Sequence, residues 1–325
     1  ILNLKLHKMG VNHPKIILRK NQNDYSSLAF ALKKFLNIDL YHFKNLEKSR
    51  CNNCKSIKKN FYLSKCIPDF NFIKNLSNDI SKKFYIRSVG KCLDCGLIQD
   101  FNRFTKNDLL RYLKQLSNKD HTISEEVWSE FPVPEKYEKF LFNRHFKKRF
   151  KRWNKKLIFK GKPKKILFLR PTLGLIMKYF NKYNSKMYFL DISKISEKTI
   201  KKKFKNANIL KGNIHGYFFG EFLKFKKNFD LIVVNHLIVH SVDFNHSFKV
   251  LKKLLKKNGK IILSDEIQIK YHNPFHLNFW DEKQLESICR KHFRKVQIIR
   301  DCGNINYSVI GATKFNDNPD FVLSN

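Results

Sequence analysis

The feature that most constrains the fold is a regular alternation of apolar and amphipathic stretches that begins after Pro163. Five strand-like segments alternate with five helix-like segments: strands at 165–169, 186–192, 208–210, 229–234 and 260–265, and helices at 174–183, 193–205, 215–225, 244–257 and 282–293. Strands separated by helical crossovers of this length form βαβ units with a parallel sheet and helices on both faces. The pattern predicts an open α/β sheet.

Two further strand-like segments, 295–301 and 304–314, close the sequence. The short stretch between them leaves no room for a helix, so we expect them to pair as an antiparallel hairpin. Together with the five preceding strands, this hairpin predicts a Rossmann-like, seven-stranded sheet over residues 161–325.

The remaining residues divide into three segments. A chain of 325 residues, 42% of them hydrophobic, is long enough for two domains, because single cores stop growing at about 250 to 300 residues. Residues 1–50 have an α/β-like pattern without an assigned role, residues 51–100 contain clustered cysteines, and residues 101–160 read as a helical connector.

The sequence favours a soluble, cytoplasmic protein. It contains no run of about 18 apolar residues that would span a bilayer, and its first residues lack the charged, apolar and cleavage regions of a secretory signal. The first residue is not Met, which indicates a trimmed or incomplete N-terminus.

Charge is the most unusual feature of the composition. The chain has 66 Lys and Arg against 27 Asp and Glu, a net charge of +39. This excess attracts nucleic acid, anionic lipid or phosphorylated substrates. However, Lys outnumbers Arg, and Asn, Ile and Phe are also abundant, which is typical of codon usage biased to A·T. Arg binds phosphate better than Lys does, because its planar guanidinium can donate two parallel hydrogen bonds. A basic surface made mostly of Lys therefore favours a small anionic substrate, and a nucleic-acid partner is the alternative.

Two cysteine pairs indicate a metal site. Cys51 and Cys54 form one CxxC pair, and Cys92 and Cys95 form a second, followed by glycine. Each pair can present two thiolates to one tetrahedral ion, and cytoplasmic proteins seldom use such pairs as disulfides. A structural Zn²⁺ is therefore predicted, with a redox or incidental role as the alternative.

Ligands of open α/β sheets bind beyond the carboxyl ends of the strands, so polar residues at those ends are candidate site residues. Asp191 ends the second strand and is placed to accept hydrogen bonds from ribose hydroxyls; the alternative is a helix cap, a role that Ser193 can fill. His236 and His240 follow the fourth strand, where two histidines are costly to bury unless a ligand uses them.

Five βα units followed by an antiparallel hairpin resemble the class I S-adenosylmethionine-dependent methyltransferases, from about Lys164 onwards. The family's first turn reads acid-x-Gly-x-Gly-x-Gly; here Phe168 takes the acid position, Arg170 and Thr172 replace two glycines, and Gly174 retains the last. The resemblance implies that this turn binds S-adenosylmethionine, and Arg170 can instead face a carboxylate or phosphate.

The segment FDLIVVNHLIVHSVD, residues 229–243, is similar to the family's fourth strand and the turn that follows it. The resemblance implies that Asn235, His236 and His240 line the mouth of the cofactor and substrate site. The segment LKKNGKIILSD, residues 255–265, matches the family's turn before the fifth strand, with a positive φ expected at Gly259.

The paired cysteines ahead of this domain, together with YHNPFHLNFWD at residues 271–281, resemble the sugar C-methyltransferases. The resemblance implies that His276 is the general base, with His240 or Tyr271 as helper and His272 beside them. The sequence departs from that family in lacking its glutamate, in wider spacing within this segment, and in having no further domain after the expected hairpin.

These observations favour an S-adenosylmethionine-dependent methyltransferase that acts on a small anionic carbohydrate or nucleotide sugar. Two alternatives stay open. One is an RNA-directed methyltransferase that uses its basic surface to hold the polymer, and the other is a methyltransferase-like binding protein without catalysis, suggested by the altered turn at Arg170.

Overall fold

The computed structural model describes residues 39–40, 50–61, 83–84, 89–101, 150–153, 162–171, 174–190, 194–214, 218–265, 267, 277–299 and 320–324. The chain divides into two compact units. One comprises residues 1–104 and 270–277, and the other comprises residues 105–269 and 278–325.

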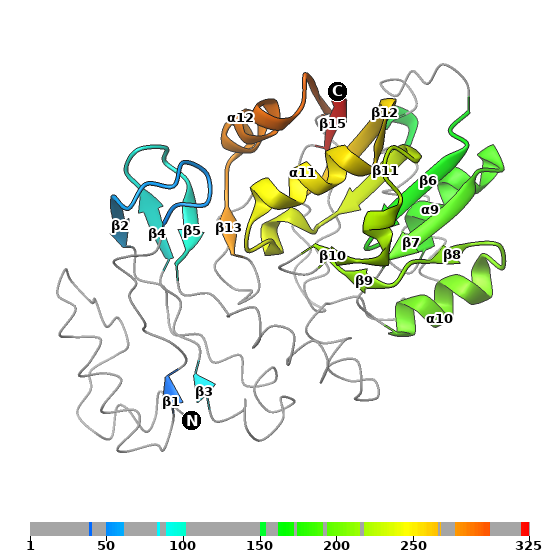
Figure 1. Cartoon of the computed structure of the whole chain (residues 1–325), viewed down its shortest axis with the longest axis horizontal. Coiled ribbons are helices and arrows are strands. Elements are labelled where there is room, and N and C mark those ends of the chain that lie inside the picture. The colour runs from blue at the N-terminus through cyan, green and yellow to red at the C-terminus, as the bar shows by residue number, and fades with distance from the viewer. Residues whose placement is uncertain are drawn as a thin grey trace. The chain divides into compact units, whose positions relative to one another are not determined.

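A mixed sheet of seven strands organises the second unit (Figure 1). Its strands are β6 (Lys165–Leu169), β7 (Lys186–Leu190), β8 (Asn208–Ile209), β11 (Phe229–Asn235), β12 (Leu255–Ser264), β14 (Lys295–Ile299) and β15 (Asp320–Ser324). They lie in the order β14-β15-β12-β11-β6-β7-β8. Strands β8, β7, β6, β11 and β12 run parallel, and β15 runs antiparallel to both of its neighbours. The predicted α/β sheet is confirmed.

Helices connect the parallel strands: α9 (Leu175–Phe180), α10 (Lys194–Lys203), α11 (Phe244–Leu254) and α12 (Glu282–His292). Their starts follow from the sequence. Asp281 and Gln284 form a reciprocal capping box at α12, and the Asp243 side chain accepts from the His246 N–H at α11. Short 3-10 turns also occur: η4 (Asn181–Tyr183), η5 (Glu221–Lys224) and η6 (Ile238–His240).

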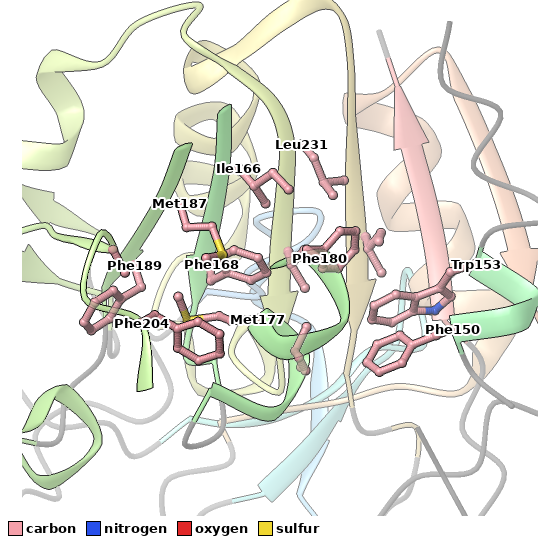
Figure 2. Packing of buried hydrophobic residues seen from close by; sticks show 14 of the residues in the cluster. Phe150, Trp153, Ile166, Phe168, Met177, Phe180, Met187, Phe189, Phe204 and Leu231 are labelled. Atoms are coloured by element: carbon pink, nitrogen blue, oxygen red, sulfur yellow. The ribbon is translucent and has the colours of Figure 1, made fainter. Parts of the chain in front are cut away.

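Aromatic side chains fill the core of this unit. Phe168 of β6 packs against Phe180 of α9, with ring centroids 5.7 Å apart. Phe189 of β7 belongs to the same cluster (Figure 2). Phe150 and Trp153, from a helical turn at 150–153, belong to the same cluster, and both side chains are fully buried. The end of the expected connector is therefore part of the sheet's core.

The partner of β14 differs from the expected one. We expected residues 304–314 to form the second strand of a hairpin, but β14 pairs with β15, in register from Lys295 opposite Ser324 to Ile299 opposite Asp320. Residues 304–314 lie outside the described residues. The sequence DFVLS at 320–324 is almost entirely buried, because β15 is flanked by β12 and β14.

The start of β12 also corrects two expectations. The helix expected to reach residue 257 ends at Leu254, because Leu255 already pairs with Phe229 of β11. The expected positive φ at Gly259 is wrong, since Gly259 lies within β12 and the described glycines with positive φ are at other positions. A side chain at Gly259 would instead meet the Phe229 carbonyl oxygen at 2.9 Å.

The helix expected at 215–225 is not present in its described part. Residues 219–220 form the short strand β10 (Phe219–Gly220), which pairs with β9 (Gly212–Asn213), and η5 follows it. Gly220 has φ 134, and a Cβ there would lie 2.2 Å from Gly212 Cα, so the two strands approach too closely for a side chain.

The first unit contains a small antiparallel sheet built from β2 (Lys59–Phe61), β4 (Val89–Cys92) and β5 (Ile98–Asp100). Two-residue strands β1 (Asp39–Leu40) and β3 (Lys83–Phe84) pair in parallel. Most of residues 1–50, and the helices expected between 101 and 149, lie outside the described residues. Within the described part of the chain, no helix is long and apolar enough to span a bilayer.

Candidate functional site

Arg170 follows directly after β6, at the carboxyl edge of the sheet. Its backbone is in the left-handed region, with φ 58, and its N–H donates to the Leu190 carbonyl at 3.0 Å. This conformation is the one that glycine adopts readily and other residues adopt at a cost. The backbone at Arg170 thus keeps the turn of a glycine motif. Where glycine has no side chain, Arg170 adds a long cationic one that is only 6% exposed.

The guanidinium of Arg170 is directed toward the residues after β11. Its Nη1 donates to the His236 carbonyl oxygen at 2.5 Å and lies 3.1 Å from His240 Nε2. Since a guanidinium has donors and no acceptor, His240 Nε2 must be the acceptor of this contact. The proton of a neutral His240 ring is then on Nδ1.

His236 is held by both neighbouring strand ends. Its φ is 45, a second non-glycine residue in the left-handed region, and its N–H donates to the Ser264 carbonyl at 2.6 Å. The His236 and His240 rings lie 5.3 Å apart between centroids. Backbone strain at two positions of one cluster is characteristic of functional sites, where the surrounding structure must impose it.

Two buried polar residues fix the 3-10 turn η6, which carries His240. Asp265, just after β12, accepts a hydrogen bond from the Val239 N–H at 3.0 Å. Asn278, which begins β13 (Asn278–Phe279), donates from Nδ2 to the Ser241 carbonyl at 2.7 Å. Both residues are at most 1% exposed. Sequence reasoning missed them, although Asp265 follows a strand end, which was the available signal.

Gly174 stands at the last position of the turn, and its backbone and its packing both favour glycine there. It precedes α9 with φ 82, and its N–H donates to the Pro171 carbonyl at 3.1 Å. A Cβ at this position would lie 2.7 Å from Phe204 Cε2, so no side chain fits without a shift. The glycine lets α9 pack closely against the segment after α10.

Apart from Gly174 and the four cysteines, the predicted site residues divide into two groups. Arg170, Asn235, His236 and His240 meet at the carboxyl ends of β6 and β11, where Asn235 is the half-buried last residue of β11. The other group lies outside the described residues: Thr172, Asp191, Tyr271, His272 and His276.

The four predicted metal ligands come together in the first unit. The Sγ atoms of Cys51, Cys54, Cys92 and Cys95 all lie within 4.8 Å of one another. The nearest contacts join the two pairs, at 3.5 Å between Cys51 and Cys95 and at 3.4 Å between Cys54 and Cys92. Each pair thus contributes to one shared cluster.

The two CxxC turns have the same backbone design. Lys55 follows the first pair with φ 66 and donates its N–H to the Cys51 carbonyl at 2.9 Å. Gly96 follows the second pair with φ 73 and donates to the Cys92 carbonyl at the same distance. Two equivalent turns facing each other bring four sulfur atoms to one point, as tetrahedral coordination requires.

Backbone N–H groups also point at the sulfur atoms. Burial raises the pKa of Cys51, although the Cys54 N–H acts in the opposite direction. Burial acts the same way at Cys92, but there the N–H of Cys95 and further hydrogen bonds outweigh it and leave the pKa below its usual value. At Cys92 these donors favour the thiolate, which is the form that binds metal.

Residues 171–263 match a protein family described as a methyltransferase domain. A methyltransferase from Archaeoglobus fulgidus, described as S-adenosylmethionine-dependent, is similar in structure, with 16% identity, coverage of 58% of this chain and 99% of that one, and a TM-score of 0.42. The protein PH0226 from Pyrococcus horikoshii is similar with 15% identity, coverage of 68% and 99%, and a TM-score of 0.37. No curated protein matches the sequence significantly.

The family match over residues 171–263 and the strand order of the sheet agree with an α/β methyltransferase fold. S-adenosylmethionine is the methyl donor expected for this domain.

Proposed function

We propose that the protein transfers a methyl group from S-adenosylmethionine to a small anionic carbohydrate or nucleotide sugar. The observation that carries the substrate class is the buried guanidinium of Arg170 at the carboxyl edge of the methyltransferase sheet, where ligands of such sheets bind. A fixed cation with planar donors is suited to a carboxylate or a phosphate.

The described residues fit the cofactor in two respects. The main chain keeps the glycine-like turn at Arg170 and at Gly174, with φ 58 and φ 82, so the backbone path of the binding turn is retained. Second, the Arg170 side chain contacts His236 and His240, so it extends toward the residues that follow β11. When bound, S-adenosylmethionine supplies an electrophilic methyl group.

The chain's own residues would then bind, orient and deprotonate the substrate. Methylation at carbon requires removal of a proton next to a carbonyl, for which a histidine near neutrality is suited. We assign this role to His276, with Tyr271 as helper and His272 as a further catalytic candidate. His240 is better suited to positioning, because its Nε2 already accepts from Arg170. Asp191 remains the proposed ribose ligand.

We also propose that Cys51, Cys54, Cys92 and Cys95 hold a structural zinc ion. Zinc–thiolate bonds of about 2.3 Å place the sulfur atoms of a tetrahedral site about 3.8 Å apart. The Sγ atoms, all within 4.8 Å of one another, are compatible with that size. Four thiolates leave no open position, so the ion would stabilise the β2-β4-β5 segment and take no part in methyl transfer.

A second candidate is a methyltransferase-like protein that binds ligands without catalysis. The specific observation in its favour is again Arg170, because a buried side chain stands where a glycine normally lets the cofactor approach the backbone. Fold retention does not by itself imply retained chemistry.

Calorimetric titration with S-adenosylmethionine and S-adenosylhomocysteine, followed by a mass-spectrometric assay for methyl transfer to nucleotide sugars, separates these candidates. Binding together with transfer supports the enzyme, and binding without transfer to any tested acceptor supports the second candidate. Loss of the anionic acceptor's affinity in Arg170→Gly, but not in the exposed control Arg294→Gly, would support the substrate class. Equal acceptor affinity in both variants would refute it.

A further inference from the structure

The amino ends of the parallel strands form the edge of the sheet opposite to Arg170. Strand β14 belongs to this set, because it and β12 both run antiparallel to β15. Lysines stand at or near the start of five of these six strands, with β8 as the exception: Lys164 and Lys165 at β6, Lys186 at β7, Lys226 and Lys227 at β11, Lys256, Lys257 and Lys260 at β12, and Lys295 at β14. We call these nine lysines the amino edge.

Several lysines of the amino edge are direct neighbours across the strands. Lys165 lies opposite Lys186 in the β6–β7 register, and Lys260 and Lys295 both lie opposite Ser324, one on each side. Burial, together with the charge of Lys295, lowers the pKa of Lys260. Like charges on adjacent strands destabilise a sheet, so the arrangement works against folding.

One carboxylate, Asp230, accompanies these lysines in the described strand starts 164–165, 186, 226–230, 255–260 and 294–295. It forms an ion pair with Lys256 at 2.7 Å and accepts the backbone N–H groups of Lys164 and Lys165 at 3.1 and 2.8 Å. The edge as a whole therefore keeps a large excess of positive charge.

The helices add lysines to the same edge, because each connecting helix runs back from the carboxyl ends to the amino ends. Lys201, Lys202 and Lys203 occupy the last turn of α10, and Lys252 and Lys253 occupy the last turn of α11. Favourable interaction with the helix dipole explains lysines at helix ends. It does not explain the lysines at the strand starts.

We propose that the amino edge is a docking surface for the phosphate backbone of single-stranded nucleic acid, separate from the methyl-transfer site at the opposite edge. From β14 to β7 the lysines span five strand spacings, about 25 Å, which suits an extended polyanion with many phosphates. A small substrate would contact only one end of this row.

A lipid surface fits the amino edge less well. Proteins that lie on membranes insert apolar side chains beside their basic residues. The exposed large hydrophobic residues in the described part of the chain are Ile57 and Leu93, and both belong to the first unit. The amino edge therefore offers charge without an apolar anchor.

The test compares two full-length variants of equal charge. The edge variant replaces Lys186, Lys226, Lys257 and Lys295 by Gln, and the control variant replaces Lys198, Lys211, Lys249 and Lys283 by Gln. All eight side chains are exposed, so both variants should fold. Binding of a fluorescent oligouridine of about 20 nucleotides is followed by anisotropy across a salt series, and anionic phosphatidylserine vesicles serve as the second probe.

We expect the edge variant to lose at least about tenfold in affinity near 100 mM salt, with a log–log salt slope shallower by about 2 to 3, because single strands contribute about 0.7 per neutralised phosphate. The control variant should keep most of its affinity. Equal losses in the two variants would show diffuse charge attraction and overturn the proposal. So would unchanged binding of the edge variant, or a loss confined to the vesicles.

Discussion

Arg170 Nη1 lies 3.1 Å from His240 Nε2, and this contact joins the end of β6 to the turn after β11 across 70 positions of sequence. Both side chains are buried. The contact assigns His240 the acceptor role at Nε2, and it places a permanent cation at the edge of the sheet where methyl transfer is proposed.

The first prediction concerns the tautomer of His240. Nitrogen-15 spectra of the imidazole rings near pH 8 should show His240 as the Nδ1–H form, because Nε2 accepts from Arg170. Arg170→Met should remove this preference, while the exposed His246 should give the same signal in both proteins. A protonated Nε2 in the wild-type protein would contradict the contact.

The second prediction concerns the cysteine cluster. By elemental analysis the wild-type protein should contain one zinc per chain, and the double variant Cys51→Ser, Cys54→Ser should purify without it, because two of the four ligands are lost. Metal loss should unfold the β2-β4-β5 segment and spare the seven-stranded sheet. Cys289→Ala, a buried cysteine of the other unit, should retain the metal, and full zinc content in the double variant would exclude the site.

The third prediction concerns Gly174. Gly174→Ala should destabilise the protein by about 2 to 4 kcal/mol, because the alanine is strained at φ 82 and its Cβ would lie 2.7 Å from Phe204 Cε2. Urea unfolding measures the change. In a double-mutant cycle, Phe204→Leu should recover part of the loss, and strict additivity of the two substitutions would argue against this packing.

The fourth prediction concerns pH. Burial raises the pKa of Asp230, but the ion pair with Lys256 and the N–H of Lys165 outweigh it and leave the pKa below its ordinary value. A depressed pKa stabilises the folded state above the unfolded value of about 3.9, and this stabilisation disappears as the pH falls through the folded value.

Asp230→Asn should therefore lower the free energy of unfolding by about 1 kcal/mol at neutral pH and have little effect at about pH 2. Urea unfolding at both pH values checks it. Glu286→Gln, which removes a surface pair with Arg290, is the control and should cost less. A cost of Asp230→Asn that does not change with pH would mean that its charge is irrelevant.

Local patterns allowed much of the sheet to be predicted. The strands β6, β7 and β11 are short, apolar and bounded by polar residues, so periodicity located them within a few residues. The end of α11 was misplaced because 255–258 continues an amphipathic pattern, while pairing between Leu255 and Phe229 favours a strand. That choice depends on a tertiary contact, which a single sequence does not reveal.

The residues of the candidate sites were likewise predictable only where the signal is local in the sequence. The cysteine cluster was predictable because each CxxC pair is a local motif whose chemistry requires a second pair. The contact between Arg170 and His240 was not, since it depends on the side-chain direction at a strained turn. Asp265 and Asn278 act through hydrogen bonds to backbone atoms of another segment, and no spacing rule predicts such partners.

The position of β15 has a consequence for how the chain folds during synthesis. Residues 320–324 leave the ribosome after β12 and β14, yet they insert between these two strands, and Asp320 accepts the indole N–H of Trp153 at 2.7 Å. Until then β14 has no neighbour among the described strands of the sheet, and the side of β12 that β15 will cover is unpaired. An unpaired strand edge is a template for association with other chains, so the nascent protein carries an aggregation-prone surface until β15 has been synthesised and inserted.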